Sequence, residues 1–139
     1  MQVDFYLLTT SDRESTWKFA ARLIEKIYRL KHRIQIQLTP AELELFNQHL
    51  WSYRAESFLP HDIANADNAN LPVLLHTQDT LLPNHEILVN FSEQIIENPP
   101  QTLKRIVEIV SQNEQDLTQS RQRYRAYQTK GFKLKIHHV

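Results

Sequence analysis

The chain of 139 residues contains no cysteine and a single glycine, Gly131. Without cysteine it has no disulfide, no thiol nucleophile and no thiolate ligand for a metal. Dinucleotide and P-loop sites need glycines after an early strand, because the backbone must approach phosphate closely there. Residues 8–12 offer none, and Asp12 would place a carboxylate where a phosphate would otherwise sit. We therefore expect neither a nucleotide nor another cofactor.

Long hydrophobic runs are also missing. No apolar segment approaches the roughly 20 residues of a membrane helix, and the chain does not begin with a basic segment followed by an apolar one. Hydrophobic residues make up 41% of the chain and charged residues 23%, as is usual for a globular protein. The length suits one domain over residues 1–139. These features predict a cytoplasmic protein that has no contact with a membrane.

Charge is distributed unevenly along the sequence although the net charge is zero. All 16 acidic residues lie at or before Asp116, together with ten basic ones, so this part carries a net charge of −6. The last 23 residues carry +6. A basic surface at one end of the domain favours an anionic partner.

The hydrophobic pattern predicts alternating strands and helices. Apolar or alternating runs indicate strands at 3–8, 33–38, 71–76, 87–91, 105–110 and 132–137. Helical spacing predicts helices over about 12–31, from Thr39-Pro40 onward to Leu50, and over 112–130. Ser11 and Glu14 are spaced as a capping box, and residues 52–71 are expected to form a loop. The strict alternation at 33–38 predicts a half-exposed strand at an edge of the sheet.

This order of elements predicts the fold class. A β-α-β-α-β beginning followed by more strands and a late helix implies a three-layer α/β fold. Its sheet should be mainly parallel and Rossmann-like, with helices on both faces and no nucleotide-binding loop.

Catalytic motifs find little support. None of the seven histidines has the spacing of a common zinc site, so no metal site is expected. His61-Asp62 is similar to the dyad of metal-dependent phosphohydrolases, but it lacks the further histidine and aspartate, and a turn in a loop is the favoured interpretation. No serine stands in a nucleophile elbow. We expect a protein that is not itself an enzyme.

Aromatic residues gather at the end of the second helix and in the following loop. The segment 50–61 contains Trp51, Phe58 and Pro60. Large apolar side chains in such a place either complete the core or form an interface, and composition alone favours the core.

A basic segment with tyrosines occupies the last helix. Arg121, Tyr124 and Arg125 share one helical face, so a phenol ring is flanked by two guanidinium groups. Guanidinium groups pair with carboxylates while the ring offers an apolar wall, which suits a short acidic peptide with an apolar end. A solvated basic helix with Tyr124 or Tyr127 in the core is an equal alternative. Nucleic acid is the other possible anion, but the stripe is short and direct DNA contact should be weak or absent.

Three segments together resemble one protein family. They are Phe-Tyr-Leu-Leu at 5–8, Leu-Trp-x-x-x-Ala-Glu-Ser-Phe-x-Pro-His at 50–61, and Arg-x-Arg-Tyr-x-Ala-Tyr-x-x-x-Gly-Phe at 121–132. They are similar to the chi subunit of the bacterial DNA polymerase III holoenzyme. This resemblance implies a non-catalytic replication adaptor that pairs with the psi subunit of the clamp-loader complex and holds the acidic C-terminal tail of single-stranded DNA-binding protein.

The resemblance also assigns the two motifs to partners. It implies that Trp51, Phe58 and Pro60 face psi and that Arg121, Tyr124 and Arg125 hold the acidic tail. The family often has a further basic residue where this chain has Leu117, which implies either a lower affinity for the tail or compensation by Arg123 and Lys130. The alternatives are a small metal-dependent phosphohydrolase using His61 and Asp62, or a domain that binds single-stranded nucleic acid directly.

Overall fold

Seven strands form one sheet in the computed structural model, which describes residues 1–53 and 59–139. The elements in chain order are β1 (Gln2–Leu7), α1 (Arg13–Arg29), β2 (Ile34–Gln37), α2 (Pro40–Ser52), β3 (His61–Ile63), β4 (Val73–His76), β5 (Ile87–Asn90), β6 (Arg105–Val110), α3 (Glu114–Thr129) and β7 (Lys133–His138).

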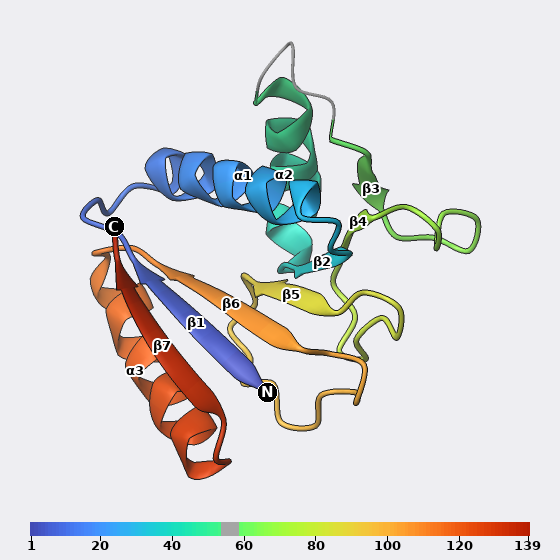
Figure 1. The fold of residues 1–139 in the computed structure, drawn as a ribbon. Helices are drawn as coiled ribbons and strands as arrows, with labels where there is room; N and C mark the ends of the chain where they lie inside the picture. The colour runs from blue at the N-terminus through green and yellow to red at the C-terminus, as the bar shows by residue number, and fades with distance from the viewer. Residues whose placement is uncertain (54–58) are drawn as a thin grey trace.

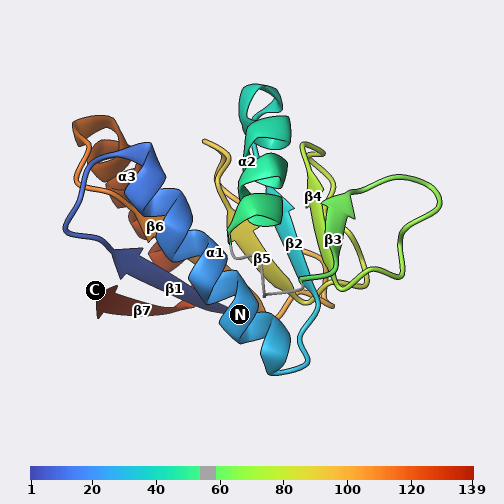
Figure 2. The same ribbon diagram turned by 90° about the horizontal axis from the view of Figure 1, so that it is seen from above.

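All of the strand pairs are parallel, in the order β3-β4-β2-β5-β6-β1-β7. Helices α1 and α2 cover one face and α3 covers the other, as Figures 1 and 2 show. The predicted three-layer α/β fold with a parallel sheet is therefore confirmed.

Two apolar cores lie on opposite faces of the sheet. The larger one joins α1 and α2 to the sheet, with Trp17, Ile24 and Phe46 facing strand residues such as Ile36 and Val89. The smaller one lies under α3 and its neighbouring loops and includes Val3, Phe5, Ile106 and Tyr127. Successive residues of a strand point to opposite faces, so β5 and β6 contribute to both cores.

Helix α1 begins one residue later than the predicted capping box requires. Asp12, not Ser11, is the N-cap, and its carboxylate accepts a hydrogen bond from the Ser15 N–H at 2.9 Å. This bond lowers the pKa of Asp12. The helix start thus already holds a negative charge, which disfavours phosphate at this position.

The prediction that residues 33–38 form a half-exposed edge strand is wrong. β2 lies between β4 and β5, and all four of its residues are buried. Its glutamine side chains can be buried because their amide groups donate hydrogen bonds to backbone carbonyls in the segment after β4. The Gln35 amide donates to the carbonyls of Leu82 and His85, and the Gln37 amide donates to that of Gln78.

The segment predicted as a loop at 52–71 contains the short strand β3, which pairs with β4 at one edge of the sheet.

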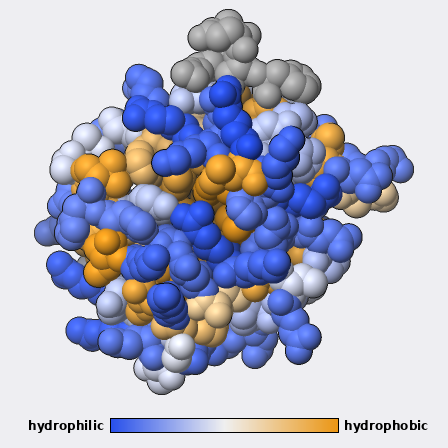
Figure 3. All heavy atoms as spheres, in the orientation of Figure 1, coloured by the Kyte–Doolittle hydropathy of each residue, from blue (hydrophilic) through white to orange (hydrophobic). Residues whose placement is uncertain are grey.

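None of the helices in the described part of the chain has the length and apolarity needed to span a membrane. Hydrophilic residues cover most of the face seen in Figure 3, with hydrophobic ones scattered among them.

Candidate protein-interaction sites

The basic motif lies mostly on α3, and its side chains point in two directions. Asn113 caps the helix by accepting from the N–H groups of Gln115 and Asp116. Arg121 and Arg125 are exposed, and neither forms an ion pair within residues 1–53 and 59–139. Their charges are available to a partner.

Tyr124 lies between these arginines and the core. Its ring is half-buried and packs on Phe5 of β1, with 5.4 Å between the ring centroids. Tyr127 is instead fully buried in the smaller core. The structure therefore brings Arg121, Tyr124 and Arg125 together as one accessible group, which we call the cationic patch.

Arg123 does not belong to this patch. It is only 8% exposed, and its Nε donates to Glu108 Oε1 at 2.8 Å. The other oxygen of Glu108 accepts from Asn90 and from the Tyr127 hydroxyl, whose pKa is raised by burial. The prediction that Arg123 compensates for Leu117 is wrong, because its charge is already neutralised inside the domain.

Lys130 also has an internal contact, since its Nζ donates to the carbonyl of Glu97. Leu117 is half-buried and packs on the smaller core, one turn before Arg121. The chain thus has an apolar side chain at the position where the resemblance leads us to expect a cation.

Strand β7 places apolar side chains beside the cationic patch. The sequence did not indicate that these side chains and the patch are neighbours. Leu134 packs on the smaller core, and Ile136 is paired with Phe5 and so shares the α3 face. Ile136 is 48% exposed. Alternation at 132–137 predicted this strand, but its position beside α3 depends on the parallel pairing with β1.

The aromatic motif, which begins in the last turn of α2, is only partly described. Trp51 is 54% exposed, and its ring contacts that of His61 with 4.2 Å between centroids. This exposure is contrary to the interpretation of Trp51 as a core residue. Pro60 is half-buried, and Phe58 lies outside the described residues.

His61 and Asp62 lie in different surroundings. His61 is buried and its Nδ1 contacts the carbonyl of Leu59 at 2.7 Å, while Asp62 is exposed and accepts from the N–H of Ile63. Within residues 1–53 and 59–139 no group of three or more histidines and carboxylates is placed to hold a metal ion.

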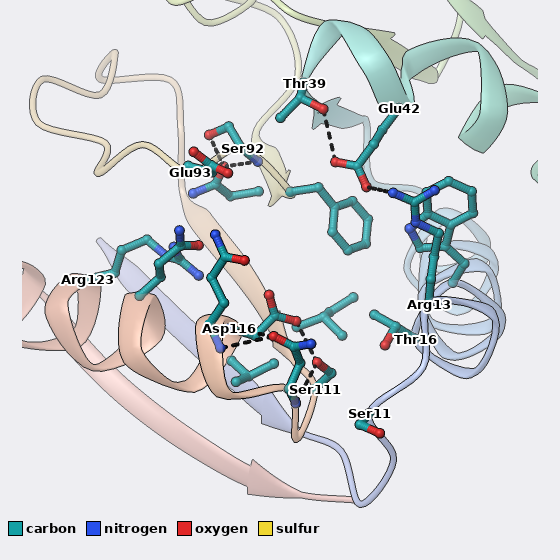
Figure 4. Close-up of a pocket in the computed structure, with 18 residues that line it drawn as sticks. Ser11, Arg13, Thr16, Thr39, Glu42, Ser92, Glu93, Ser111, Asp116 and Arg123 are labelled. Carbon is teal, nitrogen blue, oxygen red and sulfur yellow. Dashed lines mark hydrogen bonds and ion pairs between the residues drawn. The ribbon is translucent and has the colours of Figure 1, made fainter.

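A polar cleft of about 380 Å³ opens at the carboxyl ends of β5, β6 and β1. Figure 4 shows Arg13 and Glu42 on its α1–α2 side and Asp116 at the start of α3. Arg13 pairs with Glu42 at 3.2 Å, and Arg123 at the other wall pairs with Glu108. Both cations are neutralised, so the cleft is not suited to a nucleotide phosphate.

These features define the class of protein. It is an open, parallel α/β domain of Rossmann-like shape whose first strand-to-helix turn lacks the glycines and the free helix N-terminus of a phosphate site.

The family follows from comparison with known proteins. The model of the family "DNA polymerase III chi subunit, HolC" matches residues 1–135, and the chain belongs to this family. It is also 27% identical over 139 residues to the DNA polymerase III subunit chi of Pseudomonas aeruginosa strain PAO1, covering 99% of this chain and 96% of that protein. The chain is therefore a replication accessory subunit of DNA polymerase III and is not itself catalytic.

Proposed function

We propose that this chi subunit is a cytoplasmic adaptor that links the clamp loader, through psi, to the acidic C-terminal tail of single-stranded DNA-binding protein. The cationic patch carries this proposal. Two exposed arginines, which form no ion pair with the described residues, flank a tyrosine whose ring packs on Phe5. Such a patch attracts carboxylates and offers an aromatic wall to an apolar end group.

The psi-binding role rests on Trp51 in the last turn of α2 and on the segment that follows the helix. Trp51 is a large, half-exposed aromatic residue, the type that often dominates the binding energy of an interface. Pro60 lies close in sequence and keeps part of its surface exposed, and the motif extends through Phe58. This surface and the cationic patch lie on different elements, so both partners could be held at once.

Peptide binding tests the tail site. A fluorescently labelled acidic peptide with an apolar carboxyl-terminal residue is titrated with the chi subunit and followed by fluorescence anisotropy. We expect Arg121→Ala combined with Tyr124→Ala to weaken binding at least tenfold, and Lys18→Ala combined with Arg22→Ala on exposed positions of α1 to leave it unchanged. Unfolding in urea verifies that the Tyr124 variant is folded. An unchanged affinity of the first variant would show that the assigned patch is wrong.

Direct binding to single-stranded nucleic acid is the alternative to exclude. The chi subunit alone is titrated with a labelled oligonucleotide at several salt concentrations. Tight binding with a steep salt dependence would favour this alternative, because phosphate contacts release counterions.

A further inference from the structure

Strand β7 forms one edge of the sheet and leaves one side of its backbone open. Among the strands of the described residues it pairs with β1 alone, and Figure 1 shows it at the margin of the fold. The Lys133 N–H donates to the Met1 carbonyl at 3.0 Å, and the Val139 N–H donates to that of Leu7 at 3.1 Å. Backbone groups of successive strand residues point alternately to either side. Leu134, Ile136 and His138 therefore direct their N–H and C=O groups away from β1.

The side chains of β7 alternate in character as well as in direction. Lys133 and Lys135 are exposed, share a face with Asp4, and have no ion-pair partner in the part of the chain that the structure describes. Leu134 and Ile136 lie on the opposite face, beside α3. The edge thus presents cations on one face and apolar groups on the other.

This pattern selects the kind of strand that can be added. A second copy paired antiparallel with the two-fold axis at Lys135 would place Lys135 against its own counterpart, and like charges in direct opposition are unfavourable. Lysines on edge strands commonly prevent such self-association. An extended acidic segment is instead complementary to both lysines, and the arginines of the cationic patch add positive charge on the opposite side of the edge, beside α3.

Resting on the proposed function, we propose that the acidic tail binds as an eighth strand along the free edge of β7. Its backbone pairs with Leu134 and Ile136, and carboxylates on one of its faces lie near Lys133 and Lys135. Apolar side chains on its other face contact Ile136 and reach toward Tyr124. In this mode of recognition the backbone supplies affinity and the alternating side chains supply specificity.

A backbone scan of the peptide tests this geometry. Single N-methyl groups are placed at successive residues of the labelled acidic peptide, and binding to the chi subunit is measured by anisotropy. Alternate N–H groups should face β7, so we expect about tenfold losses at every second position and little change between them. Losses without this period of two, or no losses, would overturn the eighth-strand arrangement.

Amide hydrogen exchange provides a measurement on the protein itself. Saturation with the unmodified peptide should slow exchange of the Leu134 and Ile136 amides at least tenfold, whereas the Lys133 amide is already bonded to Met1. Unchanged exchange at both Leu134 and Ile136 would contradict the proposal.

Charge reversal tests the contribution of the lysines. Lys133→Glu combined with Lys135→Glu should weaken binding of the peptide at least tenfold. The matched pair Lys18→Glu with Arg22→Glu on α1 should weaken it clearly less. Equal effects of the two pairs would show that only net charge matters. If the unmodified peptide does not bind at all, the proposed function fails; if it binds but shows neither the alternation nor the new protection, only the eighth strand fails.

Discussion

Arg123 and Glu108 form an ion pair that lies between α3 and the sheet, with 2.8 Å between Nε and Oε1. Glu108 is fully buried and Arg123 is 8% exposed, although two neighbouring arginines of the same helix are exposed. One basic motif therefore contains side chains with two different roles. Arg123 holds α3 on the sheet, whereas Arg121 and Arg125 remain available to a partner.

The difference should be measurable in stability. Arg123→Ala leaves the Glu108 carboxylate buried without its cation, so we expect the free energy of unfolding to fall by about 3–5 kcal/mol. Arg121→Ala changes an exposed residue and should alter it by less than about 0.5 kcal/mol. Urea unfolding at pH 7 measures both. Equal effects would mean that Arg123 is not the anchor of α3.

Acidification should weaken the fold through His76. Burial lowers the pKa of His76 to about 4, from an ordinary value of 6.5. Its Nε2 contacts Gln35 Oε1 at 2.9 Å and its Nδ1 accepts from the Gln78 N–H, so both nitrogens are satisfied by the neutral ring. In the unfolded chain His76 becomes protonated as the pH falls below about 6.5. In the folded protein it stays neutral until the pH approaches about 4.

Stability is therefore lost as the pH falls through this window. Between pH 7 and pH 5 we expect His76 to account for a decrease of about 2 kcal/mol in the free energy of unfolding. His76→Gln should be less stable at pH 7 but should show a smaller loss on acidification, as measured by urea unfolding at the two pH values. An identical pH dependence in the variant would show that His76 does not titrate in this way.

The two tryptophans should separate stability from binding. Trp51→Ala removes a half-exposed ring, so the free energy of unfolding should change by no more than about 1 kcal/mol. The affinity for psi should fall by about 30-fold or more. Trp17 is buried against Phe46, and Trp17→Ala should cost about 3–5 kcal/mol in stability. Calorimetric titration with psi measures the affinity. A normal affinity of the folded Trp51 variant would remove this residue from the interface.

Leu117 offers a test by gain of function. Leu117→Lys adds a cation one turn before Arg121, so binding of the acidic peptide should tighten about two- to fivefold and should weaken more steeply as salt rises. Gln119→Lys is the matched control, because Gln119 lies on the same helix but lines the cleft instead. Anisotropy titrations at low and high salt distinguish the two. A similar gain in both variants would indicate an effect of net charge alone.

Sequence reasoning succeeded where local pattern and tertiary role agree. Helical spacing and Pro40 at the start of α2 predicted the helices, and β-branched runs predicted the central strands. It failed at β2, because the alternation of Gln35 and Gln37 with isoleucines is also that of a half-exposed strand. The carbonyls that accept hydrogen bonds from these buried glutamines belong to residues more than 40 positions further along the chain.

The sequence by itself determined the α/β class, the absence of a phosphate-binding loop and the accumulation of positive charge after Asp116, since these depend on composition, order and local spacing. Only the tertiary structure decided that Arg123 is neutralised while Arg121 and Arg125 are exposed, and that β7 is an edge. The physical reason is that burial, ion pairing and strand position depend on contacts between residues far apart in the chain. A local sequence pattern does not specify which distant residues will form those contacts.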